Sequence, residues 1–188
     1  MGLRGRNNLI AEEFFFVTTT VINFTKIFSD IADCDILINN IKYYQQKYNF
    51  EILAYAIMPS HFHWILKTDI SKGTVSDIMR DIKKYSAWDI LGKLKTENSV
   101  SLNNFIIASG SGQKHQLWMH RFDDEVIRNE KMLWSKIKYI HNNPVEAGIV
   151  DKPEEYKYSS ARNYINDDQS ILYIEKCWAG IDLSRNGP

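Results

Sequence analysis

The sequence predicts an α+β fold, a ferredoxin-like or RRM-like antiparallel sheet with helices packed on one face, followed by C-terminal helices. The main observation is the order of segments, strand, helix, two strands, helix, strand, read from changes in hydrophobic periodicity. This β-α-β-β-α-β order is that of ferredoxin-like domains. The second observation is size: 188 residues with 44% hydrophobic content suit a single domain, with its core from about residue 14 to about residue 164.

The N-terminal elements come from residue type and spacing. Phe14 to Ile22 is rich in β-branched and aromatic residues, which favour a strand. Asp30 or Asp33 is expected to cap the helix that follows. The apolar residues of this helix are spaced by three or four positions and form one stripe: Leu37, Ile41, Tyr44 and Tyr48.

A hairpin is expected next. Residues from Phe50 to Met58 are apolar on both alternations, as in a central strand that is buried on both faces. Pro59 and Ser60 then form a tight turn, and His61 to Lys67 is the antiparallel return strand.

The C-terminal half alternates between helical and extended patterns. A helix is expected from Val75 to about Leu91, and the polar stretch 95–113 predicts a loop with a short strand. Leu117 to Ile127 looks extended, and Asn129 to His141 is a helix that Asn142-Asn143-Pro144 should end. A further helical turn begins near Pro153, and the tail after about residue 175 is expected to be loosely held.

Composition limits the function classes. Lys and Arg number 23, as do Asp and Glu, so the whole chain has no net attraction for polyanions, although a local basic patch would suffice for DNA. Cys34 and Cys177 lie far apart and outside any C-x-x-C motif, which is typical of a reducing, cytoplasmic location. No apolar run approaches the roughly 20 residues of a membrane span, so no membrane partner is expected.

His61 and His63 are the first candidate site residues. Residues two apart on a strand point to the same face, so these imidazoles should project together, away from Phe62 and Trp64. Imidazole is a common ligand for divalent metals, although two histidines do not make a complete site.

The helix after the hairpin offers the missing groups. Tyr85 continues the apolar stripe of Ile78 and Ile82, and Asp89 follows it by one turn. If this helix end lies over the histidines, Asp89 becomes the third metal ligand and Tyr85 a nucleophile beside the ion. A phenol attacking a metal-bound phosphate would form a covalent phosphotyrosyl intermediate.

Basic and aromatic residues could hold the nucleic acid. Lys83, Lys84 and Arg80 flank Tyr85 and are expected to meet phosphates. Trp118 and Arg121 are expected to stack on or grip an unpaired strand.

The segment Met58-Pro59-Ser60-His61-Phe62-His63-Trp64 resembles the His-hydrophobic-His motif of the single-tyrosine HUH transposases. Within that family, the REP-associated tyrosine transposases are the most similar branch. The resemblance continues through Leu117-Trp118, Arg121-Phe122 and Val126-Ile127-Arg128, the block from Tyr139 to Gly148, and Pro153 to Ser160. It covers the chain from about Phe14 to about Tyr164.

The resemblance implies an enzyme that cuts and joins single-stranded DNA, typically at a hairpin, with Mg²⁺ or Mn²⁺. It implies His61 and His63 as metal ligands and Tyr85 as the nucleophile, which leaves a 5′-phosphotyrosine and a free 3′-OH. Asp89 stands where the family often has an amide as the third ligand. Relatives occur as monomers and as homodimers, so the oligomeric state stays open.

Three alternatives remain at this stage. The chain could be a non-catalytic, RRM-like module that binds single-stranded nucleic acid by stacking bases on aromatic residues. It could be another HUH nuclease, a replication initiator or relaxase, against which the block from Asn143 to Gly148 argues. It could also be a metal-binding protein unrelated to DNA.

Overall fold

The computed structural model describes residues 14–107, 114–178 and 181–183 of the chain. Its centre is a four-stranded antiparallel sheet with the strand order β2-β3-β1-β4. The strands are β1 (Phe14–Thr20), β2 (Glu51–Met58), β3 (His61–Lys67) and β4 (Asp123–Val126). The main helices are α1 (Ile31–Tyr48), α2 (Val75–Thr96), α3 (Glu130–Glu146) and the short α4 (Ala161–Ile165).

The element order and the strand order confirm the predicted α+β class. The chain runs β1, α1, β2, β3, α2, β4, as in a ferredoxin-like domain, and then continues into α3 and α4. The predicted hairpin forms around Pro59 and Ser60, and the β3 range matches the expected return strand. Asp30 is the α1 cap, since its side chain accepts a hydrogen bond from the Ala32 N–H group.

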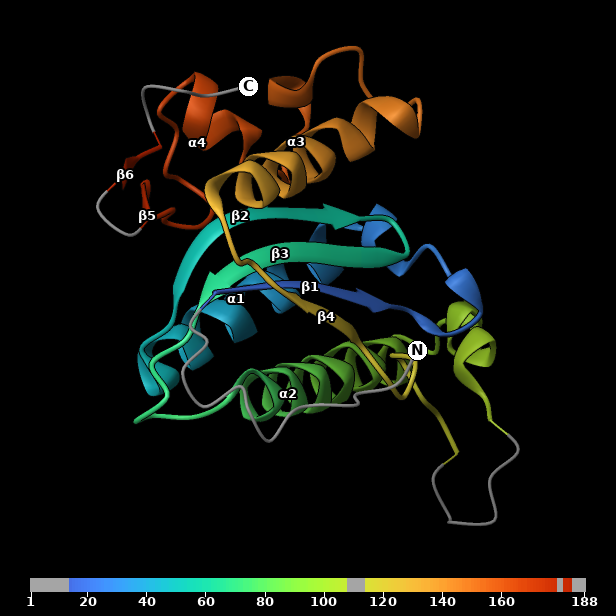
Figure 1. Cartoon of the computed structure of the whole chain (residues 1–188). Coiled ribbons are helices and arrows are strands. Elements are labelled where there is room, and N and C mark those ends of the chain that lie inside the picture. Colours follow the sequence, from blue (N-terminus) through green and yellow to red (C-terminus); the bar gives the residue numbers. More distant parts are fainter. Residues whose placement is uncertain (1–13, 108–113, 179–180, 184–188) are drawn as a thin grey trace.

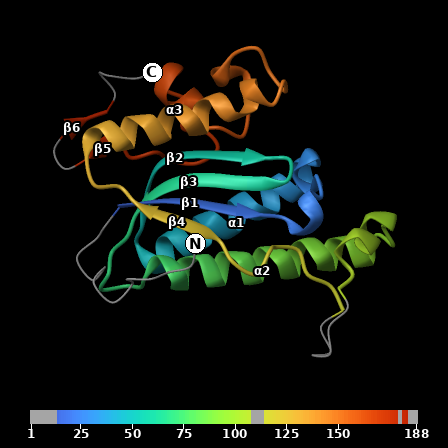
Figure 2. The same cartoon turned by 45° about the vertical axis from the view of Figure 1, so that its right-hand side comes forward.

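The sheet separates two cores: α1 and α2 lie on one face, as expected, and the C-terminal helix α3 lies on the other. Helices α1 and α2 cover one face, where they pack against Phe62 and Trp64 of β3. Helix α3 lies on the opposite face, over β2 and β3, as the two views in Figures 1 and 2 agree. It does so because its own apolar stripe must be buried, and three residues of that stripe contact Ile65 and the alanines of β2: Leu133, Ile137 and Ile140.

Three boundaries differ from the sequence prediction. Helix α2 continues to Thr96, and β4 is restricted to four residues because the segment before it pairs only through an isolated bridge between Val21 and Trp118. Part of the predicted loop 95–113 forms a short 3-10 helix, η4 (Val100–Phe105), whereas residues 108–113 lie outside the described residues. Three further 3-10 turns are η2 (Ile22–Phe24), η3 (Ile27–Ser29) and η5 (Pro153–Glu155).

Helix α3 shows the most consequential difference, because it runs through Pro144 to Glu146 and does not end before Asn142. Proline disfavours helical geometry in the preceding residue, but burial of Pro144 and of the apolar stripe holds this last turn in place. The helix ends at Glu146, and Gly148, whose φ of +66° is left-handed, follows two residues later.

The described part of the C-terminal tail is attached to the fold, contrary to the expectation of a loosely held tail. The Glu175 N–H group donates to the Ile52 carbonyl at 2.8 Å, and Leu183 is fully buried in the α3 core. A two-stranded ribbon, β5 (Cys177–Trp178) with β6 (Ile181–Asp182), lies between these two contacts. Within the residues described, no helix is both long enough and apolar enough to cross a bilayer.

A buried carboxylate joins α1 to α2. Asp81 accepts hydrogen bonds from Lys47 at 2.8 Å, from the Tyr48 hydroxyl at 2.6 Å and from Arg80 at 2.9 Å. Burial by itself would raise the pKa of this carboxyl, but these hydrogen bonds outweigh burial and lower the pKa to about 2. The folded state is therefore stabilised by the ionised form of Asp81.

We expect Asp81→Asn to remove part of the acid sensitivity of this protein. Because the pKa is lower in the folded state than in the unfolded chain, the stabilisation is present above pH 4 and is lost as the pH falls toward 2, by about 2 kcal/mol. Denaturant unfolding at pH 7, 4 and 2 measures the free energy of unfolding at each pH. Asp89→Asn, on the same helix, is the control. An unchanged acid dependence in Asp81→Asn would contradict this account.

Candidate active site

The two histidines of β3 lie together on the α3 side of the sheet. His63 pairs with Thr18 and His61 with Thr20 across the β1–β3 ladder, so all four side chains share one face. The imidazole centroids of His61 and His63 are 4.7 Å apart. The structure confirms the predicted convergence of the two rings.

His63 is held as a neutral imidazole with one free nitrogen. Its side chain is 4% exposed, and its Nδ1 lies 2.7 Å from the Thr18 hydroxyl oxygen. Burial, helped by the charges of His61 and Lys136, lowers the pKa of His63 to about 3. Its Nε2 atom is buried and finds no hydrogen-bond partner among the described residues. When Nδ1–H donates to Thr18, this Nε2 carries a lone pair, as a metal ligand must.

His61 is linked to the last turn of α3. Burial lowers the pKa of His61, and a hydrogen bond with the Asn143 side chain opposes that effect. Asn143 is therefore within hydrogen-bond reach of one imidazole of the pair. Its amide oxygen is a suitable metal ligand beside two neutral imidazoles.

Tyr139 lies against the other imidazole. Its ring meets the His63 ring edge-on, with 5.2 Å between the centroids, and meets the Phe16 ring edge-on at 5.9 Å. The side chain is 44% exposed, so its phenol is accessible. Asn143 follows Tyr139 by four residues, one helical turn, which places both on the same side of α3.

The far side of α3 is fixed to β2 by a buried hydrogen-bond chain. Nε2 of His141 lies 2.8 Å from the Ser160 hydroxyl, and that hydroxyl accepts a hydrogen bond from the Tyr55 N–H group at 2.9 Å. Burial lowers the pKa of His141 to about 3, so this imidazole is neutral. His141 was expected to be the last residue of this helix; the structure instead makes it a buried residue within α3 that helps to set the position of the helix.

The structure does not bring Tyr85 and Asp89 to the histidines. The Tyr85 ring packs on Tyr44 of α1, with centroids 5.7 Å apart, and belongs to the core on the other face of the sheet. Asp89 accepts a hydrogen bond from Asn40 at 2.9 Å. Among the described residues, no cluster of three or more His, Cys, Asp or Glu side chains is placed to hold a metal. The expected His61, His63, Asp89 set is therefore wrong, because α2 covers the opposite face.

The expected DNA-binding residues on α2 have other contacts. Lys83 donates to the Met119 and His120 carbonyls at 2.7 and 3.0 Å, and burial lowers its pKa to about 8. Arg80 pairs with Asp77 and Asp81, as described for the α1–α2 contact.

The remaining expected DNA contacts divide into buried and exposed residues. Trp118 is buried and donates its indole N–H to the Ser86 hydroxyl at 3.0 Å, which excludes base stacking in this arrangement. Lys84 lies over the Tyr85 ring at 5.0 Å, on the α2 face. Arg121 is exposed, and its role in DNA binding stays a prediction.

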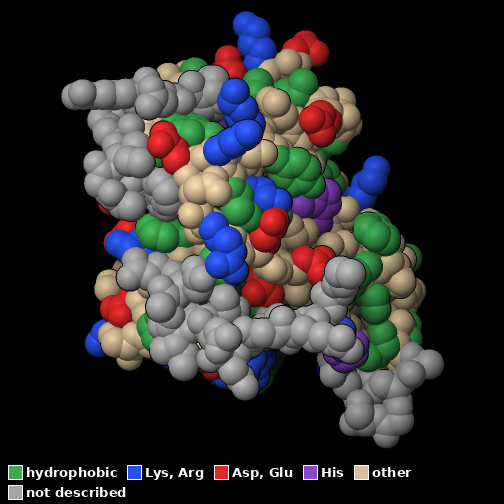
Figure 3. Space-filling model, in the orientation of Figure 1, with side chains coloured by type: hydrophobic (Ala, Val, Ile, Leu, Met, Phe, Trp, Pro, Cys, Tyr) green, Lys and Arg blue, Asp and Glu red, His purple; other side chains and the backbone are tan. Residues whose placement is uncertain are grey.

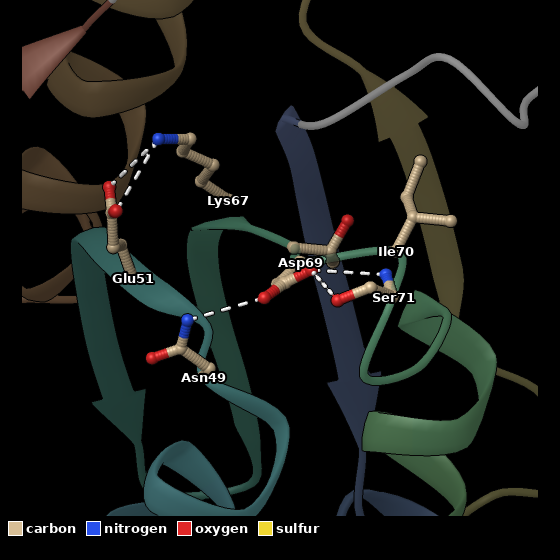
Figure 4. A pocket seen from close by; sticks show the side chains of 7 residues that line it. Asn49, Glu51, Lys67, Asp69, Ile70 and Ser71 are labelled. Carbon is tan, nitrogen blue, oxygen red and sulfur yellow. Dashed lines mark hydrogen bonds and ion pairs between the residues drawn. The ribbon is translucent and has the colours of Figure 1, made fainter.

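One face of the molecule, shown in Figure 3, carries histidine and hydrophobic side chains together with basic and acidic side chains. A separate hollow lies at the other end of the β2–β3 hairpin, near Asn49 and Lys67 (Figure 4). Its polar groups satisfy one another, since Lys67 pairs with Glu51 and Asp69 accepts from Asn49 and Ser71. The lining of that hollow includes neither His61 nor His63.

The sequence profile of the family described as "Transposase IS200 like" matches residues 17–143, which is more than half of the chain and includes both histidines, Tyr139 and Asn143. The chain belongs to the IS200-like transposase family. This confirms the resemblance drawn from the sequence and the expected enzyme class, a tyrosine-dependent DNA transposase.

Two named relatives are similar to this transposase in sequence. A Haemophilus influenzae protein named after the REP-associated tyrosine transposases is 24% identical over 145 residues, which cover 76% of this chain and 74% of that protein. The REP-associated tyrosine transposase of Escherichia coli K12 is 27% identical over 111 residues, or 59% of this chain and 54% of that one.

A solved structure of a REP-associated tyrosine transposase bound to a REP hairpin has the same fold. It superposes with a TM-score of 0.67 and 21% identity, and the match covers 98% of this chain and 96% of that chain. At 21% identity, this likeness is evidence for the fold alone.

The sequence held a signal for Tyr139 and Asn143 that its interpretation missed. Their spacing of four is the same as that of Tyr85 and Asp89. Because the predicted helix ended at His141, Asn143 lay outside it and was not expected on the same helical face as Tyr139. In the structure the helix continues through Pro144, which places Asn143 on the same side of α3 as Tyr139.

We expect imidazole ¹⁵N NMR of the metal-free transposase to show His63 as a neutral ring with the proton on Nδ1 from pH 8 to pH 5. Burial disfavours a second proton on the ring, and the Thr18 hydroxyl accepts the hydrogen bond that Nδ1–H donates. Thr18→Val, which keeps the shape and removes the acceptor, should weaken the tautomer preference. A titration midpoint near 6.5 or a proton on Nε2 would contradict this assignment.

Proposed function

We propose that this transposase cuts and rejoins single-stranded DNA at hairpins and that Tyr139 is its nucleophile. The observation that carries the proposal is the edge-on contact between the Tyr139 and His63 rings, 5.2 Å between centroids. It joins an accessible phenol to a pair of neutral imidazoles within one chain. Tyr85 is not proposed for this role, because the sheet separates it from the histidines.

His61, His63 and the Asn143 amide oxygen would hold a divalent cation, Mg²⁺ or Mn²⁺. Three features support the fit: the Nε2 of His63, which has no hydrogen-bond partner among the described residues, the pKa values of both imidazoles, which burial lowers, and the reach of Asn143 to His61. The bound ion would supply Lewis-acid stabilisation to a phosphate oxygen.

The reaction proposed for Tyr139 is a transesterification. Its phenolic oxygen forms a bond to the phosphorus as the bond from phosphorus to the 3′ oxygen breaks. The phenol loses its proton, the departing 3′ oxygen gains one, and a 5′-phosphotyrosine remains. Attack by a second 3′-OH reverses these steps, frees Tyr139 and joins the strand to a new end.

Hairpin DNA as the substrate is supported by the fold likeness to a transposase bound to a REP hairpin. Tyr139 and both histidines come from the same chain, so a second copy is not required to complete the site. The homodimer expected from some relatives stays a prediction that this arrangement does not need.

Tyr139→Phe should abolish the covalent protein–DNA adduct and leave hairpin binding within about twofold, because only the hydroxyl is lost. The measurement is a denaturing gel after incubation with Mn²⁺ and a pool of labelled single-stranded hairpins. Tyr85→Phe is the matched control and should form the adduct at the wild-type rate. Loss of the adduct in Tyr85→Phe alone would return the nucleophile to α2.

The same assay separates the enzyme from a module that only binds nucleic acid. If the wild-type protein binds hairpins but forms no adduct under any divalent ion, the binding module is the better description.

Mn²⁺ affinity tests the ligand set independently of cleavage. Asn143→Ala should weaken binding by at least about tenfold, and His61→Ala or His63→Ala by more. Asp89→Asn should leave affinity unchanged, because that carboxylate bonds to Asn40 instead. Isothermal titration or Mn²⁺ EPR gives the values, and circular dichroism checks that each variant is folded. A large loss of Mn²⁺ affinity in Asp89→Asn, with no loss in Asn143→Ala, would contradict the proposed ligand set.

A further inference from the structure

Lys136 occupies a distinctive position next to the candidate active site. It stands on α3 three residues before Tyr139 and seven before Asn143, so the three share one side of the helix. Its ammonium lies 4.5 Å from the centroid of the Phe16 ring, which in turn stacks on the His63 ring at 5.9 Å. Asn143 thus adjoins the imidazole pair at one end of this row, and Lys136 stands at the other end, with Tyr139 between them.

We propose that Lys136 contacts a phosphate of the DNA strand beside Tyr139, on the side away from Asn143. This inference rests on the proposed function and adds a second cation to the site. The substrate strand would then meet positive charge on both sides of the nucleophile, the bound metal at one end and the ammonium at the other. Lysine is suited to this role because its ammonium acts as a point charge with three donors.

Acidic residues of the edge strand β4 lie on the same sheet face as the site. Glu125 and Asp123 of β4 pair with Phe16 and Thr18 of β1, so their carboxylates lie on the same sheet face as the histidines. Lys136 forms an ion pair with Glu125 at 2.6 Å. Without the lysine, these two carboxylates would repel an approaching phosphate.

The ion pair and the ring contact also hold Lys136 ready for a ligand. Its side chain is 26% exposed and partly ordered by Phe16, whereas the Glu125 side chain is 54% exposed. An exposed partner gives up a contact to solvent at small cost, since surface ion pairs contribute little. The ammonium can therefore pass from the carboxylate to a phosphate with little rearrangement.

The test is the salt dependence of hairpin binding. Lys136→Met should reduce the slope of log K against log[salt] by about 0.7 and weaken binding about fivefold at 0.1 M salt, as expected for one lost single-strand phosphate contact. Lys136→Arg should restore both. Lys138→Met removes the same charge from a residue about 200° further around the helix and should leave the slope unchanged.

A double variant separates a phosphate contact from simple neutralisation of Glu125. If Lys136 contacts DNA, Lys136→Met combined with Glu125→Gln keeps the reduced slope. If the double variant returns to the wild-type slope and affinity, Lys136 only cancels Glu125 and the proposal is overturned. A wild-type slope in Lys136→Met alone overturns it as well.

The two proposals fail in different ways. Failure of the proposed function appears as an absent adduct in the wild-type protein, whether or not that protein binds hairpins. Failure of the Lys136 inference appears as an unchanged slope in a wild-type background that binds hairpins and forms the adduct.

Discussion

The candidate site depends on the close packing of α3 against the histidine face of the sheet. Ala54 and Ala56 of β2 are fully buried under this helix, and their small side chains allow it to lie close to the strand. A series of hydrogen bonds from His141 through Ser160 to Tyr55 fixes the position of α3. The other side of the same helix can then place a phenol and an amide over two imidazoles, because a packed core allows few alternative positions.

The two faces of the sheet have different roles. Helices α1 and α2 bury the large residues of β3 on one face and are joined by the Asp81 contacts. The aromatic residues there, including Tyr85 beside Tyr44, serve packing. Among the described residues, α3 packs on the opposite face mainly over β2 and β3, and β1 keeps half-exposed side chains beside the histidines. The proposed chemistry would take place beside these side chains of β1.

The charge distribution reconciles a neutral chain with a DNA substrate. Whole-chain charge governs long-range attraction, whereas a transesterase needs cations within a few ångströms of the phosphate. Here several basic side chains are used internally: Lys47 and Arg80 bind Asp81, and Lys83 binds backbone carbonyls. Counting basic residues along α2 therefore overestimated the DNA-binding surface, because the count ignored their buried partners.

The sequence by itself determined the fold class, the hairpin and the shared face of His61 and His63, because strand alternation and turn residues are local properties. It also carried the family resemblance, which the comparison with the family profile confirmed. It did not determine which helix covers the histidines, since two helices offered a tyrosine followed four residues later by a possible ligand. Only tertiary packing decided that, by burying α2 on one face and α3, with its proline in the last turn, on the other.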